Sequence, residues 1–594
     1  MRSSGFKLLK IGYCLVSGYI FMKYLRIKPM PLIWFIIAIV FYILLEKCRD
    51  IHKEKRTFWY AIFALLLASS LIICYHIKVD FGNLLGNISI SYLTNYGGGD
   101  IIAFIILLHM IVIISIKFHN ALTSYIDSRN IDVNRCGTRS VFQLCIISIF
   151  IFIAWLPYFL NYYPGIVYPD SLKSIYQALG LNPFSNHHPV FYTLFIKVCL
   201  AIGYRIQDMN LGCAIYTLIQ MAYISTILSY SICWMRNKGV SQWICMFTMM
   251  FYSLVNCFPQ LAISMWKDPI FSATIMFYSL KLFDLIMSRG GATKSKCFVG
   301  QVLLASLIFC LVRNNGIYVL ILSVCAIIII RMKLKNDFLT HNHFLKLNFI
   351  LIVGVLFLTG PVYSEMGIEK PTTESFGIPL QQMARTVVYE GEISQDEAKF
   401  LNSLLPLEKY KELYCPGFVD KIKFDREFDR EFLDNSKNEF ISTWLSLMFK
   451  NPKIYFDSWC MNTYGYWSLS FWELNYYSGN IATGDLEGIY RMDNCGIYPR
   501  NLLKESGIDI SNYMPLVSPM ISIGLCTWVI IFVFSFCLKE KCGRYTLVLI
   551  PSLGVLLTLL VATPMVYWPR YAAVNLYMLP VYLNIPIFVR KSNI

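Results

Sequence analysis

Long apolar stretches recur along the chain and alternate with short polar ones. A transmembrane helix needs about 20 mostly apolar residues, and this rule predicts fourteen spans. They lie near 7–26, 30–46, 57–75, 100–117, 141–160, 211–233, 241–258, 269–287, 297–313, 316–332, 345–363, 514–538, 545–562 and 571–589. The pattern therefore predicts an all-α polytopic membrane protein.

Clusters of lysine and arginine indicate the orientation. Short basic loops such as 47–56, 234–240 and 539–544 are predicted to be cytoplasmic, because positive charge collects in loops on that side. Both termini then lie in the cytoplasm, which requires an even number of crossings. A further apolar stretch at 190–206 would reverse every later loop if it crossed. We therefore place it at the outer interface or as a re-entrant piece.

The composition supports the same class of protein. Hydrophobic residues make up 56% of the 594 residues and charged residues 15%, whereas a soluble domain carries roughly 25% charge. The net charge of +16 would suggest a nucleic-acid partner in a soluble protein. Here short cytoplasmic loops account for the excess of basic residues. The lipid bilayer is the expected partner, and nucleic acid is not.

Residues 364–513 differ from the rest of the chain. They hold 23 of the 36 acidic residues but 15 of the 52 basic ones, and long domains cross the membrane regardless of their charge. This segment is predicted to be a large extracytoplasmic α-rich domain, with a helix near 395–413 that presents Phe400, Leu401 and Leu404 on one face. The chain then divides into N-terminal spans, a membrane core with an outer loop at 161–210, the outer domain and C-terminal spans: 1–140, 141–363, 364–513 and 514–594.

The outer loop at 161–210 holds the first candidate site residues. Pro169 and Asp170 open a short amphipathic helix, so Asp170 is either an N-cap or a carboxylate that accepts a proton at the membrane boundary. His187 and His188 follow near the start of another helix, whose N-terminal amides favour anions. They could bind phosphate or orient an acceptor, and packing at the interface explains them equally well.

Other predicted outer loops add further charged residues. Lys267 and Asp268 precede Pro269, so Asp268 also has an N-cap interpretation. Arg313 and Arg570 lie in two more outer loops, where each could bind an anionic headgroup bidentately or extend toward lipid phosphate. All these residues fall on one predicted face, while ionisable residues within spans are sparse. A transport path would show the opposite pattern.

Five strings resemble a family of bacterial multi-spanning membrane proteins of largely uncharacterised function: YPGIVYPDS, SNHHPVFYTLFIK, MWKDPIF, RNNG and GIPLQQMARTVV. That family is in turn distantly similar to the GT-C class of glycosyltransferases, such as protein O-mannosyltransferases and lipid A aminoarabinose transferases. The resemblance extends from about Asn161 to Arg570. The chain departs from it in residues 1–140, whose about four predicted spans precede the span that leads into the motif loop; most GT-C enzymes have one span before that loop.

The resemblance implies a GT-C-like inverting glycosyltransferase of the bacterial cytoplasmic membrane. It implies a polyprenyl-phosphate sugar donor and transfer of a hexose or pentose, on the outer face, to a glycan, lipid or protein acceptor. Asp170 matches the first-loop aspartate that acts as base or positions the acceptor, and Asp268 matches a second acidic position. The GIPLQQMAR stretch would place Gln381, Gln382 and Arg385 near the same site.

Cofactor chemistry receives little support from the sequence. No glycine-rich phosphate loop follows a strand, so no nucleotide cofactor is predicted; no residue is assigned to a metal, and a divalent metal stays open. Two other functions also stay open. One is a polysaccharide polymerase or ligase that uses a polyprenyl-diphosphate donor, and the other is a transporter of lipid-linked sugars.

Overall fold

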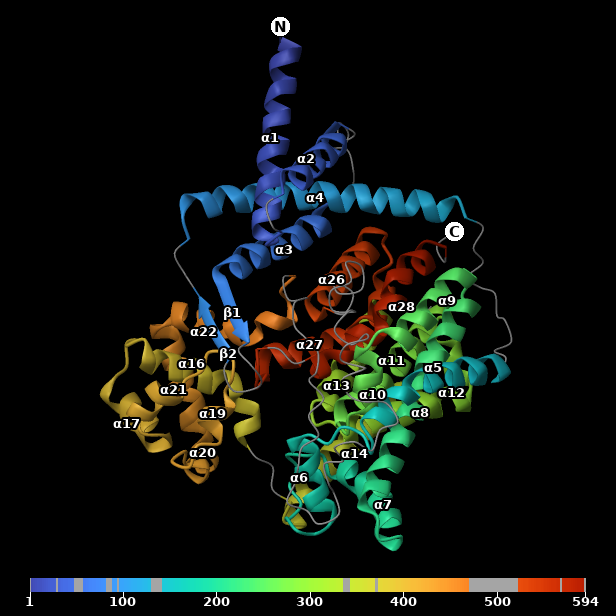
Figure 1. Ribbon diagram of the computed structural model, residues 1–594, viewed down its shortest axis with the longest axis vertical. Coiled ribbons are helices and arrows are strands. Elements are labelled where there is room, and N and C mark those ends of the chain that lie inside the picture. The colour runs from blue at the N-terminus through green and yellow to red at the C-terminus, as the bar shows by residue number, and fades with distance from the viewer. Residues whose placement is uncertain are drawn as a thin grey trace. The chain divides into compact units, whose positions relative to one another are not determined.

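The computed structural model describes residues 2–27, 30–46, 57–81, 88–92, 96–129, 141–334, 342–368, 372–469, 522–566 and 569–591. In these ranges the chain is helical apart from one two-stranded sheet (Figure 1). It forms two compact units. The first consists of Met1–Leu122, Pro371–Phe471 and Leu557–Trp568, and the second of Thr123–Lys370, Trp472–Leu556 and Pro569–Ile594.

Eight helical segments in the described part of the chain are long and apolar enough to cross a membrane. They are α3 (Phe58–His76), α4 (Gly98–Asp127), α5 (Val141–Asn161), α8 (Met209–Asn237), α11 (Lys267–Met287), α13 (Gly316–Leu334), α14 to α15 (His343–Glu365) and η9 with α28 (Pro569–Lys591). A ninth crossing results if α9 (Gln242–Leu254) and α10 (Cys257–Ile263), which are bent by 55°, form one span. The protein is therefore an all-α polytopic membrane protein.

Shorter apolar helices occupy other predicted spans: α2 (Pro31–Glu46), α12 (Lys296–Val312), α26 (Ile523–Lys539) and α27 (Ile550–Ala562). The N-terminal helix α1 covers Arg2–Tyr24. The stretch that we place at the interface forms α7 (Val190–Arg205). The count of fourteen spans, their orientation and the four-part division of the chain stay predictions, and the end of the predicted outer domain, 470–513, lies outside the described residues.

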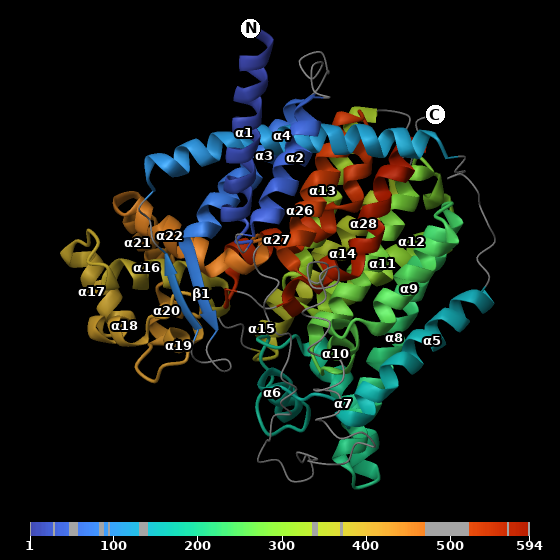
Figure 2. The ribbon, with the colours of Figure 1, turned by 45° about the horizontal axis from the view of Figure 1, so that its top comes forward.

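The second unit is built around two deeply buried helices. The apolar stretches of α11 and of η9 with α28 are 78% and 94% buried within the protein, respectively. Figure 2 shows α8, α9, α11 and α28 running side by side. Hydrogen bonds join the surrounding helices: the Trp155 indole donates to the Tyr252 carbonyl (3.0 Å), and the Tyr252 hydroxyl donates to the Tyr577 carbonyl (2.6 Å). These hydrogen bonds join α5 to α9 and α9 to α28.

The first unit combines α1 to α4 with an antiparallel hairpin and a helical domain. The hairpin pairs β1 (Ile77–Phe81) with β2 (Ile88–Tyr92). The helical domain contains η5 (Thr372–Phe376), α16 (Gly377–Val388), α17 (Gln395–Leu404), α18 (Leu407–Leu413), α19 (Asp420–Lys423), α20 (Arg430–Asn435), α21 (Lys437–Lys450), α22 (Pro452–Thr463) and η6 (Tyr464–Tyr466). Its α-rich character agrees with the sequence-based expectation.

This helical domain has a hydrophobic core of its own. Phe400, Leu401 and Leu404 point into the core as their spacing predicts, together with Tyr410 and Leu447. A capping box at Ser394 begins α17. The predicted helix at 395–413 is divided after Leu404, since Pro406 cannot donate a backbone hydrogen bond and becomes the N-cap of α18.

Candidate functional site

Backbone hydrogen bonds join two loops of the second unit without the help of any charged side chain. Ile166 forms a parallel bridge with Ser264, in which the Ile166 amide donates to Ile263 (2.9 Å) and the Met265 amide donates to Ile166 (3.0 Å). Gly165 makes this approach possible, because its φ is +120° and a Cβ there would lie 2.3 Å from the Thr217 hydroxyl oxygen. The bridge brings the loop before Asp170 against the loop before Asp268.

The two aspartates enter helices but do not cap them. The short helix α6 (Pro169–Ala178) has Tyr168 at its N-cap, and α11 has Trp266, with no side-chain cap hydrogen bond at either position. Asp170 and Asp268 instead lie in the first turn of their helices. The N-cap interpretation of these residues is therefore wrong, and their carboxylates are available for other contacts.

Those carboxylates pair with two arginines. Arg570 Nη2 donates to Asp170 Oδ2 (2.6 Å) and its Nε lies 3.7 Å from Asp268 Oδ2. Arg313 Nη1 lies 2.9 Å from Asp268 Oδ1, and it also donates to the Tyr571 carbonyl (3.2 Å). Both arginines are largely buried in these pairs. They belong to one network of charges rather than extending singly toward lipid.

The two carboxylates differ in how much of their side-chain surface is exposed to solvent. The side chain of Asp170 keeps 40% of its surface exposed, and that of Asp268 keeps 1%. Asp170 can therefore meet a substrate, whereas Asp268 is sequestered between arginines. Burial acts to raise the pKa of Asp170, but the positive charges of Arg570 and Lys267 outweigh it and hold that pKa well below its usual range.

Aromatic rings hold the Arg570 guanidinium in place. It lies over the ring of Trp266 (4.4 Å to the centroid) and near that of Tyr571 (4.9 Å), whose hydroxyl accepts from Nη2 (3.1 Å). The ring of Tyr168 stacks on the ring of Trp266, and their centroids lie 4.2 Å apart. The sequence analysis assigned no site role to these aromatic residues. Their positions within two residues of Asp170, Lys267 and Arg570 in the chain were the signal that could have found them.

Lys267 and the histidines line the same region of the second unit. The Lys267 ammonium lies 3.4 Å from the His187 carbonyl oxygen, and Asn314 donates to the Asn186 carbonyl (2.7 Å). His188 is buried, and its Nε2 has no hydrogen-bond partner among the described residues. Burial and the charge of Lys267 lower the pKa of His188, so its imidazole is neutral at pH 7. A neutral imidazole nitrogen can accept or donate one hydrogen bond to a ligand.

The cluster has an excess of positive charge. Lys267, Arg313 and Arg570 face two carboxylates, Asp170 and Asp268, and within the described residues Lys267 forms no ion pair. Burying a cation that has no ion-pair partner costs free energy unless an anionic ligand binds beside it. The site is therefore suited to a ligand with one negative charge.

Three residues of the GIPLQQMAR stretch belong to the first unit and not to this cluster's unit. Gln381 donates to the Cys415 carbonyl (2.9 Å) and Gln382 to the Tyr455 carbonyl (3.1 Å), while Arg385 donates to the Tyr414 hydroxyl (3.3 Å) and lies over the Tyr389 ring. Each packs α16 into the helical domain. Their proposed role near the site stays a prediction.

The ion pair of Asp170 leads to a prediction about pH. Because the pKa of Asp170 is lower in the folded than in the unfolded protein, the pair stabilises the fold fully above about pH 4 and is lost as the pH falls through the folded-state pKa. We expect the difference in melting temperature between wild type and Asp170→Asn to be constant from about pH 5 to 8 and to shrink only in stronger acid. Thermal unfolding in detergent across this range measures it. A difference that vanished between pH 5 and 7 would contradict the low pKa.

The described ranges contain no preformed metal-binding site. No group of three or more histidine, cysteine, aspartate or glutamate side chains lies close enough together there to hold a metal ion. The cations of the cluster supply positive charge at the site.

Comparison with known families identifies the chain. It is a polytopic membrane protein with a charged cluster at the ends of its helices, and the model of a family described as "Family of unknown function (DUF6020)" matches residues 182–591. Because this match covers more than half of the chain, the protein belongs to that family. The matched region includes Asp268, Arg313 and Arg570 and begins after Asp170. No curated protein and no solved structure matches the chain.

Proposed function

We propose that this protein is a GT-C-like membrane glycosyltransferase that takes a sugar from a polyprenyl-phosphate donor. The observation that carries the proposal is the cluster in which one exposed carboxylate, Asp170, adjoins three cations, of which Lys267 forms no ion pair within the described residues. A polyprenyl-phosphate sugar is a phosphodiester with a single negative charge. That charge matches the excess on the cluster, whereas a diphosphate donor would bring two negative charges.

The reaction would be a single displacement at the anomeric carbon. The acceptor hydroxyl oxygen bonds to that carbon as the bond from the carbon to the phosphate oxygen breaks, so polyprenyl phosphate leaves with the electron pair and the configuration inverts. The proton of the hydroxyl passes to the Asp170 carboxylate. Asp170 is a weak base because its pKa is low. It suffices, since an acceptor oxygen already bonded to the anomeric carbon is strongly acidic.

The leaving phosphate gains negative charge as its bond to the sugar breaks. Lys267 and Arg570 would stabilise that charge, and the buried position of Arg570 strengthens the interaction. His188 would add one hydrogen bond through its Nε2, which has no partner among the described residues. We assign the reaction to the outer face of the bacterial cytoplasmic membrane, with a glycan, lipid or protein as acceptor.

The proposal is tested by incubating the purified protein, in lipid, with a panel of radiolabelled polyprenyl-phosphate sugars and crude envelope acceptors. We expect consumption of one donor and transfer of its label to an acceptor. Consumption of polyprenyl-diphosphate sugars alone would contradict the proposal and favour a polymerase or ligase. Movement of an intact lipid-linked sugar across the bilayer, with no transfer, would favour a transporter.

A substitution of Arg570 tests the role of its guanidinium. Lysine keeps the charge but cannot contact Asp170, Asp268 and the Tyr571 hydroxyl together or stack on Trp266. We expect Arg570→Lys to lower kcat for donor consumption by about 100-fold. Arg590→Lys is the matched control, because Arg590 lies about 30 Å away near the other end of the helical segment Pro569–Lys591 and pairs with Asp127. Equal rates in the two variants would argue against the role of Arg570.

A further inference from the structure

Helix α21 of the first unit has two apolar faces. One face buries Phe440 and Leu447 in the core of the helical domain. The other presents Ile441, Leu445 and Phe449, spaced four residues apart, and all three are exposed; Phe449 keeps 78% of its surface. Because residues four apart lie on the same side of a helix, these side chains form a continuous apolar strip that the described chain leaves uncovered.

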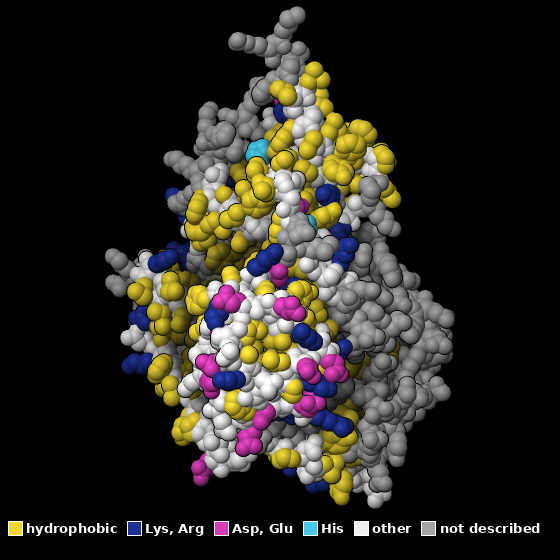
Figure 3. All heavy atoms as spheres, turned by 90° about the vertical axis from the view of Figure 1, so that its left-hand side faces the viewer, with side chains coloured by type: hydrophobic (Ala, Val, Ile, Leu, Met, Phe, Trp, Pro, Cys, Tyr) yellow, Lys and Arg dark blue, Asp and Glu magenta, His cyan; other side chains and the backbone are white. Residues whose placement is uncertain are grey.

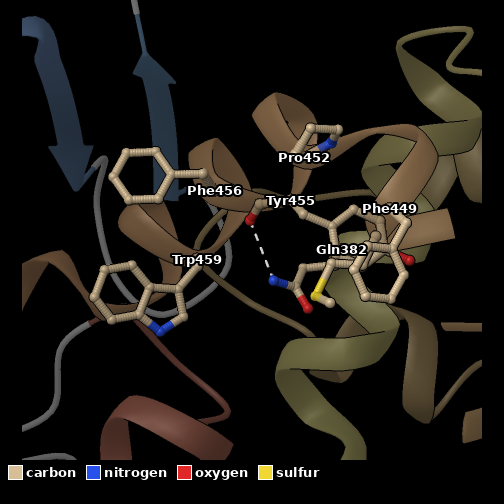
Figure 4. Close-up of a pocket in the computed structure, with 7 residues that line it drawn as sticks. Gln382, Phe449, Pro452, Tyr455, Phe456 and Trp459 are labelled. Atoms are coloured by element: carbon tan, nitrogen blue, oxygen red, sulfur yellow. Dashed lines mark hydrogen bonds between the residues drawn. The ribbon is translucent and has the colours of Figure 1, made fainter. Parts of the chain in front are cut away.

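An open groove continues this strip where α21 meets α22. It has a volume of about 530 Å³ and is lined by Gln382, Met448, Phe449, Pro452, Tyr455, Phe456 and Trp459. Figure 4 shows the rings of Phe456 and Trp459 on one side of Gln382 and that of Phe449 on the other. The corner that forms the groove is firmly held, since the Asn451 side chain accepts from the Glu392 amide (2.8 Å) and donates to its carbonyl (2.9 Å).

The lining favours an apolar chain over a sugar. Gln382 is the one hydrogen-bonding amide in it, and both ends of that amide are engaged: its nitrogen donates to the Tyr455 carbonyl (3.1 Å) and its oxygen accepts from the Trp444 indole (2.8 Å). A sugar stacked on the aromatic rings would need hydrogen bonds for its hydroxyl groups. A hydrocarbon chain needs none.

Other parts of the domain's surface carry many charged side chains. Charged side chains such as Glu390, Asp396 and Lys399 are exposed on or beside α17. Figure 3, which views the molecule from the side on which α17 lies in Figure 1, shows acidic and basic side chains interspersed on this face. The apolar strip and groove therefore lie on a domain whose surface also has strongly charged parts.

Aromatic rings line the groove, and a lysine follows one of its lining residues in the chain. Phe456 stacks against Trp459 and Trp459 against Trp467, with centroids 6.2 and 6.4 Å apart. Lys453, which follows Pro452 in the chain, is exposed. Aromatic residues combined with lysine are enriched where a protein surface meets the headgroups of a bilayer.

We propose that this lipid-facing surface, defined as Ile441, Leu445, Phe449, Pro452 and Phe456, lies against the phospholipid bilayer and that an acyl chain occupies the groove. The same unit contains α3 and α4, which are long and apolar enough to span a membrane. The bilayer around those helices is therefore an apolar partner that this surface can contact. Lys453 then faces the phosphate of a phospholipid. The inference does not depend on the proposed transfer reaction.

The experiment places the photoreactive residue p-benzoylphenylalanine at position 449 or 456 of the full-length protein. Both sites already hold an exposed phenylalanine, so the fold should tolerate it, and a melting curve checks this. Position 399 is the matched control, since Lys399 is 77% exposed on the polar side. The protein is reconstituted in vesicles of phosphatidylcholine and phosphatidylglycerol, illuminated and analysed by mass spectrometry.

We expect phospholipid adducts at 449 and 456 in several-fold excess over those at 399, with phosphatidylglycerol over-represented because of Lys453. Adducts to residues 470–521 of the same chain, or to a second copy of it, would overturn the proposal by naming a protein occupant. Phospholipid labelling equal to that at position 399, or no labelling, would also overturn it.

Discussion

Replacing Asp170 with asparagine is expected to abolish sugar transfer while the protein stays folded. The amide cannot take the proton from the attacking hydroxyl, and loss of a general base lowers rates by about 10²- to 10⁴-fold. The fold should persist because the Asp170 side chain is 40% exposed and Arg570 retains Asp268, 3.7 Å from its Nε. Initial rates of donor consumption, measured beside a melting curve, give both quantities.

Asp396→Asn is the matched control for this variant. Its side chain is 95% exposed on α17 in the first unit, so the same change should leave both rate and stability as they are. Transfer at the wild-type rate by Asp170→Asn would remove Asp170 from the mechanism. A loss of rate shared by Asp396→Asn would point to a general effect of lowered charge.

Replacing Asp268 with asparagine is expected to destabilise the protein strongly. Its carboxylate is 1% exposed and faces both Arg313 and Arg570. The change leaves the largely buried Arg313 guanidinium without its carboxylate partner and leaves Arg570 with Asp170 alone. Breaking a buried ion pair from one side costs about 3–5 kcal/mol. We expect a lower melting temperature in detergent than for either wild type or Asp170→Asn.

The comparison of the two aspartate variants separates two roles. Asp170→Asn should lose activity with a smaller loss of stability than Asp268→Asn, which should lose stability first. An Asp268→Asn protein that melted like wild type but had no activity would contradict this division and make Asp268 itself a catalytic residue. The double variant Asp268→Asn with Arg313→Met should recover part of the stability, since it also removes one unpaired charge.

The helices of this protein follow from its sequence because membrane spans leave a strong apolar signal. Helices form in the described ranges of every predicted span, from Arg2–Tyr24 to Ala573–Lys591. Shorter features were harder to foresee. The strands Ile77–Phe81 and Ile88–Tyr92 were not predicted, since five residues carry little periodicity. The break after Leu404 depends on Pro406, which the apolar spacing of that segment does not register.

The candidate site was predictable in its residue types but not in its pairing. Charged residues in loops that face one way indicated a cluster, and Asp170, Lys267, Asp268, Arg313 and Arg570 do come together in the second unit. Which arginine meets which aspartate depends on residues up to 400 positions apart and on a backbone bridge that no local pattern encodes. Likewise, the position of Gln381 and its neighbours depends on how α16 packs, which closeness to a span in the sequence does not determine.

The most direct test of the proposed function is the lipid product released for each sugar transferred. The purified protein in lipid is given a radiolabelled polyprenyl-phosphate sugar, and the released lipid is separated by chromatography. The account predicts one polyprenyl monophosphate per sugar transferred by wild type and by Asp396→Asn, and none by Asp170→Asn. Release of polyprenyl diphosphate from a diphosphate donor, or turnover that does not depend on Asp170, would contradict it.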